Sequence, residues 1–181
     1  MNAAPSPIEM IFHKQQQLIE AFHGIEHPMM PDIHTLAGQQ KLRLTVLFFI
    51  EELFEASDAL NTLEDSPLEE FADALHFLIE LAIFAGVKPA QLEESPASHI
   101  ISVGGWQDVV LQAGSVVYNL KHKPWKRNPK PTSESNLRVS IIGLYAEFIA
   151  LVGHYTITQD ELFEAYHAKH QKNNERINSN V

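Results

Sequence analysis

Apolar side chains recur every three or four residues along nearly the whole chain, and they rarely alternate with polar ones. This spacing gathers apolar residues on one face of a helix, whereas a half-buried strand requires alternation. Proline and glycine cluster between the periodic stretches, where they end helices. The pattern predicts an all-α protein with about six helices, at residues 6–23, 38–61, 66–86, 105–121, 134–153 and 159–177.

Two linkers interrupt the predicted helices where the composition changes. Residues 95–105 contain Ser-Pro-Ala-Ser and end in two glycines, and residues 122–133 are basic and rich in proline. Both are predicted to be exposed loops, because proline removes a backbone donor and breaks helices. Short linkers elsewhere favour antiparallel neighbours, so we expect one antiparallel helical bundle and a single domain over residues 1–181.

Length and composition narrow the class of protein. The 181 residues are 45% hydrophobic and 20% charged, as in a globular chain with its own core. The sequence has no cysteine, which excludes disulfides, thiolate metal sites and cysteine nucleophiles. We identify no apolar run near the roughly 18 residues of a membrane span and no signal-peptide pattern. We therefore expect a cytoplasmic protein with no membrane partner.

Charge is distributed unevenly along the sequence. Residues 1–100 carry 16 acids and 4 bases, whereas residues 101–181 carry 7 acids and 9 bases. The formal net charge of −10 makes nucleic acid an unfavourable partner. Residues 51–80 hold ten acids and neither Lys nor Arg, so we expect a cationic ligand in that region.

Two pairs of acids fall on apolar helix faces. Glu52 and Glu55 are three residues apart in the second predicted helix, and Glu70 and Asp73 repeat this spacing in the third. Residues three apart share one side of a helix, and antiparallel packing would make the two pairs face each other. Carboxylates in a low-dielectric interface repel unless they share protons or bind a cation. Mg²⁺ is the predicted cofactor, with Mn²⁺ as an alternative, because hard cations prefer oxygen ligands.

A lone pair of acids three residues apart is most often a solvated helix face. Two pairs on consecutive helices, both within apolar stripes, argue against that interpretation here. The other acids of the region lie off these stripes or in the linker, and we assign them to solvent. They are Glu51, Asp58, Glu64, Asp65 and Glu69.

A polar and basic stripe follows in the last predicted helix. Lys169, Asn173 and Arg176 recur at helical spacing, and Tyr166 precedes them by one turn. Arginine offers a planar fork for phosphate oxygens and lysine a compact charge, so the stripe can hold phosphates. Taken alone, it can equally be the favourable basic end of a helix.

These three segments together resemble a known family. The sequence contains IEELFEASDAL at 50–60, EEFADALHFLIELA at 69–82 and AYHAKHQKNNERIN at 165–178. The ordered motifs E-x-x-E, E-x-x-D-x-x-H-F and Y-x-x-K-x-x-x-N-x-x-R are similar to those of the all-α dimeric dUTP pyrophosphatases. That family is part of the MazG-like nucleotide pyrophosphohydrolase superfamily.

The resemblance implies an activity and a set of site residues. The implied reaction is hydrolysis of a deoxynucleoside triphosphate, with dUTP expected, to the monophosphate and pyrophosphate by a homodimer. As our own hypothesis about the reaction, Glu52 and Glu55 are the catalytic carboxylates, with Glu55 as the general base. The remaining roles would be Glu52, Glu55, Glu70 and Asp73 for metal, Lys169, Asn173 and Arg176 for phosphate, and Gln15 and His76 for the base.

Three alternatives stay open from the sequence. The enzyme could be a MazG-like pyrophosphohydrolase for dCTP or a purine nucleotide, or the chain could be an inactive helical adaptor with an acidic patch for a basic partner. His76 could instead be a histidine at the edge of the core, hydrogen-bonded to Glu80 or Glu69.

Overall fold

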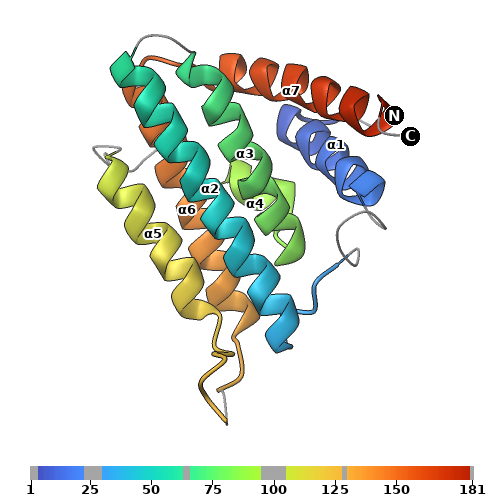
Figure 1. Cartoon of the computed structure of the whole chain (residues 1–181), viewed down its shortest axis with the longest axis vertical. Coiled ribbons are helices and arrows are strands. Elements are labelled where there is room, and N and C mark those ends of the chain that lie inside the picture. The colour runs from blue at the N-terminus through green and yellow to red at the C-terminus, as the bar shows by residue number, and fades with distance from the viewer. Residues whose placement is uncertain (1–3, 23–29, 63–65, 95–104, 128–129, 180–181) are drawn as a thin grey trace.

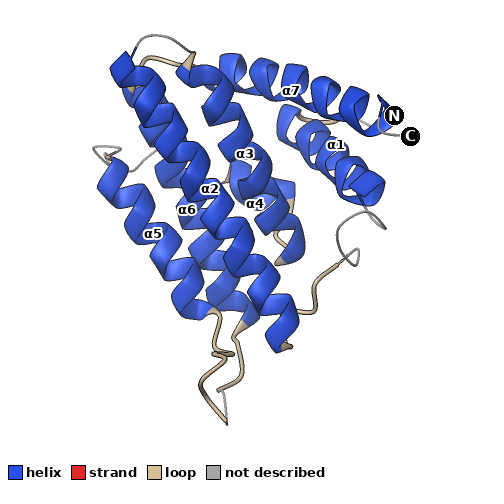
Figure 2. Cartoon of the chain, viewed as in Figure 1, coloured by secondary structure: helices blue, strands red, loops and turns tan. Residues whose placement is uncertain are grey.

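The computed structural model describes residues 4–22, 30–62, 66–94, 105–127 and 130–179. Within these ranges all regular structure is helical (Figures 1 and 2), which confirms the predicted all-α class. The helices are α1 (Pro7–Phe22), α2 (Leu36–Thr62), α3 (Pro67–Phe84), α4 (Pro89–Glu93), α5 (Trp106–Asn119), α6 (Glu134–His154) and α7 (Gln159–Ser179).

The short helix α4 is the one element missing from the predicted six. Pro89 opens it, and the Lys88 backbone N–H donates to the Gln91 side chain at 2.9 Å. Gly86 has a φ of +69°, a left-handed conformation that favours glycine and separates α4 from α3. Five residues are too few to show a helical period, so the hydrophobic pattern left these residues outside the predicted helices.

Helix α3 forms the centre of the bundle. It contacts α1, α2, α6 and α7, and it is therefore apolar on most sides except near its N-terminal end. Phe71 at that end packs edge to face against Phe148 of α6, which in turn packs against Phe49 of α2. These three rings are fully buried and fix the first turns of α3 against α2 and α6.

Two antiparallel helix pairs make up the body of the bundle, α2 with α3 and α5 with α6. In the second pair, Gln112 donates to the backbone carbonyl of Ser140 at 3.3 Å. A neutral side-chain amide and a backbone carbonyl thus meet in the α5–α6 pair, whereas carboxylates meet in the α2–α3 pair. Among the described residues, the cluster of acids able to hold a cation lies on the first pair.

Helix α6 is long and apolar enough to cross a membrane, so our expectation that no stretch approaches a span was wrong. Half of that stretch is buried inside the bundle, where α6 contacts α3, α4, α5 and α7. The core helix of a soluble protein has these same properties, so α6 is weak evidence for a membrane.

The structure describes most of the second predicted loop but little of the first. Residues 95–104 of the first linker lie outside the described residues, as do Glu64 and Asp65. The described part of the second linker is mostly exposed, as predicted, but Thr132 is buried because its hydroxyl accepts from the Gln39 side chain at 2.6 Å.

Candidate metal and nucleotide site

Three of the four predicted metal ligands gather at one place. Oxygens of Glu52 and Glu55 from α2 and of Glu70 from α3 all lie within 4.8 Å of one another. Glu52 and Glu70 are half-buried and Glu55 is exposed. Such an arrangement of oxygen donors, open to solvent on one side, fits a hard divalent cation that keeps some water ligands. We call these three residues the acidic cluster.

Aromatic packing holds the two helices together beside the acidic cluster. Phe48 of α2 and Phe77 of α3 pack in a tilted arrangement with ring centroids 5.3 Å apart, one turn away from Glu52 and Asp73 respectively. The apolar stripes to which these half-buried rings belong also fix the direction in which the neighbouring acids point. Side-chain packing therefore positions the carboxylates even though they repel one another.

The electrostatics of the acidic cluster reflect that repulsion. Burial, reinforced by the charges of Asp73, Glu55 and Glu70, raises the pKa of Glu52 to about 7. Burial also raises the pKa of Glu70, with Asp73 and Glu55 adding to the shift and Lys169 opposing it. A divalent cation would reverse these shifts because it stabilises the charged carboxylates.

Asp73, the fourth predicted ligand, forms an ion pair with a lysine beside the acidic cluster. Its carboxylate accepts from Lys169 Nζ of α7 at 2.6 Å, next to the acidic cluster but not within it. Burial opposes the charge of Lys169, yet the hydrogen bond to Asp73 and the charges of Asp73 and Glu70 raise its pKa overall. The predicted phosphate-binding lysine and the predicted metal ligand are thus brought together.

The rest of the predicted phosphate stripe continues along α7. Asn173 is half-buried one turn beyond Lys169, and Arg176 is exposed after a further turn. Glu69, which we assigned to solvent, is exposed but lies 3.6 Å from Lys169 Nζ and 3.5 Å from Lys172 Nζ. Its exposure confirms the assignment to solvent, and its two lysine contacts help to hold α7 against α3.

A buried polar triad connects the predicted base-binding residues. The side-chain oxygen of Gln15 accepts from the hydroxyl of Tyr166 at 2.8 Å and lies 2.8 Å from Nδ1 of His76. The rings of His76 and Tyr166 stack with centroids 3.9 Å apart. Residues from α1, α3 and α7 thus form one unit, and the alternative partners Glu80 and Glu69 for His76 were wrong.

The triad also determines which nitrogen of His76 carries hydrogen. Because Gln15 Oε1 can only accept, Nδ1 must donate, and Nε2 remains as an acceptor. Nε2 is buried with no hydrogen-bond partner among the described residues. Burial, followed by the charge of His170, lowers the pKa of His76 to about 3, so the ring is neutral near pH 7. Sequence spacing gave no sign of this unit, since its members are 61 and 151 residues apart.

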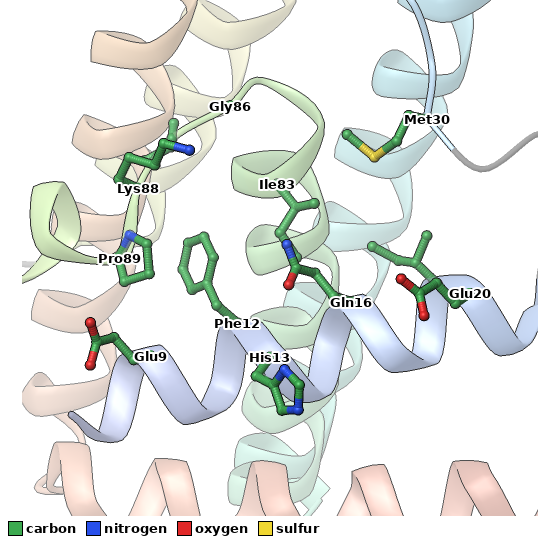
Figure 3. Close-up of a pocket in the computed structure, with 12 residues that line it drawn as sticks. Glu9, Phe12, His13, Gln16, Glu20, Met30, Ile83, Gly86, Lys88 and Pro89 are labelled. Carbon is green, nitrogen blue, oxygen red and sulfur yellow. The ribbon is translucent and has the colours of Figure 1, made fainter. Parts of the chain in front are cut away.

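A groove of about 690 Å³ lies elsewhere, between α1 and the turn that joins α3 to α4 (Figure 3). Phe12 and Gln16 of α1, Gly86 and Lys88 line it, together with eight others. It contains none of the predicted site residues and lies at the opposite end of α3 from the acidic cluster. The groove therefore does not identify the place where the chemistry would occur.

An all-α bundle with carboxylates gathered on two antiparallel helices and a lysine beside them is the arrangement of a helical nucleotide pyrophosphohydrolase. The sequence model of the dUTPase family matches residues 57–181 of this chain. Because that is more than half of its length, the chain belongs to the all-α dUTPase family and is a nucleoside triphosphate pyrophosphohydrolase of the dUTP diphosphatase type. No curated protein and no solved structure matches the chain.

The family match does not cover the whole site. It includes Glu70, Asp73 and Lys169 but begins after Glu55, so Gln15, Glu52 and Glu55 lie outside it. The case for these three residues rests on their geometry, with Gln15 in the buried triad and the two glutamates within reach of Glu70.

We predict that a divalent cation stabilises the fold. Binding to the native state alone adds about 2.7 kcal/mol at a hundredfold excess over Kd, which corresponds to a rise in Tm of about 5–10 °C for a chain of this size. Differential scanning calorimetry with Mg²⁺ or Mn²⁺, compared with chelator, measures the rise. It should shrink in Glu52→Gln, and an unchanged wild-type Tm would contradict the metal site.

We predict that the Tyr166 hydroxyl stabilises the triad. Tyr166→Phe removes a buried donor to Gln15, which should lower the free energy of unfolding by about 1–2 kcal/mol in urea titrations. Tyr118→Phe is the control, because Tyr118 is 70% exposed and should change stability by less than about 0.5 kcal/mol. Equal effects at both positions would show that the triad does not contribute.

Proposed function

We propose that this protein hydrolyses dUTP to dUMP and pyrophosphate in a Mg²⁺-dependent reaction. The observation that carries the proposal is the acidic cluster of Glu52, Glu55 and Glu70, within 4.8 Å of one another and beside the Lys169–Asp73 pair. Bound Mg²⁺ would neutralise phosphate charge and lower the pKa of a water at this place.

Residues of the chain itself would accept the proton of the attacking water and bind the phosphates. Glu55 is the most exposed member of the acidic cluster, so it is the carboxylate best placed to accept a proton from the attacking water. Lys169 can exchange its contact with Asp73 for a phosphate oxygen, because both are charge-assisted acceptors. Asn173 and Arg176 follow on the same helix and would contact the phosphates farther from the α-phosphorus.

The buried triad supports the choice of base. A neutral His76 with an unpaired Nε2 acceptor suits a nucleobase that presents an N–H, as the imide of uracil does. Cytosine lacks that imide hydrogen, and a polar site left without its partner discriminates strongly against such an analogue. Gln15 and Tyr166 would fix the orientation of His76, so Gln15 would act on base choice through His76 as well as by contact.

One panel of substrates tests this function. Pyrophosphate release from dUTP, dCTP, dTTP, dATP and dGTP should be greatest for dUTP with Mg²⁺ and should vanish with chelator. A preference for dCTP or a purine nucleotide would contradict dUTP as the substrate. It would favour the alternative of a MazG-like pyrophosphohydrolase for that nucleotide. No metal-dependent release from any nucleotide would favour the inactive adaptor.

We further propose that the enzyme acts as a homodimer in the cytoplasm. The dimer is implied by the family resemblance and is supported by large apolar side chains that remain exposed on α2 and α5, including Leu47, Phe54 and Leu111. Sedimentation equilibrium on the purified chain measures the association.

A further inference from the structure

Helix α2 has a stripe of outward-facing residues that no part of the described chain covers. The residues of this stripe follow one another at alternating steps of four and three. They include large apolar side chains, of which Leu44 is 37% exposed, Leu47 58% and Phe54 68%. Alternating steps of four and three are the spacing of a seam between two paired helices. The members of this seam are Gln40, Leu44, Leu47, Glu51, Phe54 and Asp58.

A basic loop is fastened beside the N-terminal half of the same helix. Arg43 of α2 donates to the carbonyl oxygens of Leu120 and His122 at 2.7 and 2.6 Å. Gln39 is fully buried and its side-chain oxygen accepts from the His122 backbone N–H at 2.8 Å. Two side chains of α2 thus fix the start of the loop that hangs below α5 and α6 in Figure 1.

The fastened loop concentrates positive charge. Burial, and then the charges of Arg43, Lys121 and Lys126, lower the pKa of Lys123, which shows that these cations lie close together. Trp125, in the middle of the loop, is 76% exposed. We call Arg43 and residues 121–127 the basic end of α2.

The opposite end of the seam is acidic. Glu51, Glu55 and Asp58 are all exposed on the C-terminal half of α2, and the described part of that half has no lysine or arginine. The face is therefore positive at one end, apolar in the middle and negative at the other end. A face of this kind is complementary to a copy of itself turned by a two-fold rotation.

We propose that a second copy of this chain pairs its α2 antiparallel along the seam, so that the basic end of each copy meets the acidic end of the other. A two-fold axis near residue 49 places Leu44 opposite the partner's Phe54 and Gln40 opposite the partner's Asp58. Parallel pairing is disfavoured because it would set Glu51 and Asp58 against the same residues of the partner. This inference rests on the proposed homodimer and adds which face forms it.

The first test compares exposed apolar residues on and off the seam. Phe54→Asp and Leu47→Asp should raise the dimer dissociation constant at least about tenfold in sedimentation equilibrium, because each buries a charge in the contact. Val139→Asp is the matched control, since Val139 of α6 is 68% exposed, as Phe54 is, and lies off the seam. If the seam variants stay dimeric, the seam is not the dimer interface. The proposal of a homodimer would be unaffected by that result.

A monomeric wild type would overturn both the seam and the homodimer. Pyrophosphate release from dUTP by that same sample tests the proposed hydrolysis separately, so the two failures are distinguishable. All substituted positions are solvent-exposed in one chain, so the Tm of each variant at low concentration should match that of the wild type and report intact folding.

Cross-linking tests the direction of pairing. The chain has no cysteine, so introduced cysteines are the only thiols present. Antiparallel pairing separates residue 44 from its own copy by about 15 Å along the axis, too far for a disulfide. Leu44→Cys and Phe54→Cys should therefore oxidise to a dimer only when mixed. A disulfide-linked dimer of Leu44→Cys alone would overturn the antiparallel arrangement.

Charge exchange tests the contact between the two ends. Asp58→Lys and Lys126→Glu should each weaken the dimer severalfold, and the double variant should regain most of the wild-type affinity. Both residues are exposed and neither belongs to the acidic cluster. Additive weakening in the double variant would show that the ends do not meet.

Discussion

Glu70→Gln is expected to lower kcat/KM for dUTP by at least about a hundredfold. Glu70 is half-buried, and its carboxylate is the single contribution of α3 to the acidic cluster. A neutral amide keeps the shape of the side chain but removes the charge that a divalent cation requires. Steady-state kinetics at saturating Mg²⁺ measures the loss.

The same substitution should have the opposite effect on the metal-free fold. Burial raises the pKa of Glu70, so its charged form destabilises the native state near neutral pH. Glu70→Gln removes one of the repelling charges and should raise the Tm in chelator while it reduces the further rise with Mg²⁺. A variant that only loses Tm in both conditions would indicate misfolding rather than a metal ligand.

Glu69→Gln is the matched control for this prediction. Glu69 is adjacent in sequence, but its side chain is 52% exposed and faces Lys169 and Lys172 instead of the acidic cluster. An exposed ion pair contributes about 0–1 kcal/mol, so kcat/KM should stay within about fivefold of the wild type. Equal losses at Glu69 and Glu70 would contradict the assignment of helix faces.

The sequence predicted those parts of the site that follow from local periodicity. Glu52, Glu55 and Glu70 meet because spacing by three within a helix and a short connection between helices are both visible in the chain. The limits of α2, α3, α5, α6 and α7 agree with the predicted ranges to within two residues for the same reason. A long helix repeats its pattern often enough to be recognised.

The parts that escaped prediction depend on packing between distant segments. Gln15, His76 and Tyr166 come from three helices, and only the way α1 and α7 lie on α3 brings them together. Asp73 has the same spacing as the other acids, but its contact with Lys169 of α7 could not be predicted from that spacing. Glu69 gains partners from α7 by the same contact.

The contact between Lys169 and Asp73 also connects stability to function. Without a bound cation, Lys169 partly neutralises the carboxylates of Glu52, Glu70 and Asp73, which would otherwise repel one another more strongly. The position that stabilises the resting fold is also next to the place where phosphates would bind. Lys169 would therefore stabilise the fold before substrate binds and contact the phosphates of the substrate afterwards.

Lys169→Met should consequently change three measured quantities, lowering kcat/KM and Tm and raising the affinity for Mg²⁺. Losing a charge-assisted phosphate contact costs about 1.5–3 kcal/mol, so kcat/KM for dUTP should fall about ten- to hundredfold. The Tm in chelator should also fall, because Asp73 loses its partner at 2.6 Å. The affinity for Mg²⁺, measured by calorimetric titration, should instead rise severalfold, since a competing positive charge has left the site.

Lys172→Met provides the comparison, because Lys172 shares the partner Glu69 but is 54% exposed and has no contact with Asp73 among the ion pairs of the described residues. It should leave kcat/KM, Tm and the Mg²⁺ affinity nearly unchanged. A purely structural role for Lys169 predicts a lower Tm, with unchanged kinetics at temperatures well below that Tm. A purely phosphate-binding role predicts slower turnover with no change in Mg²⁺ affinity. Only a lysine shared between Asp73 and the substrate moves all three measurements, with stability and turnover falling while metal affinity rises.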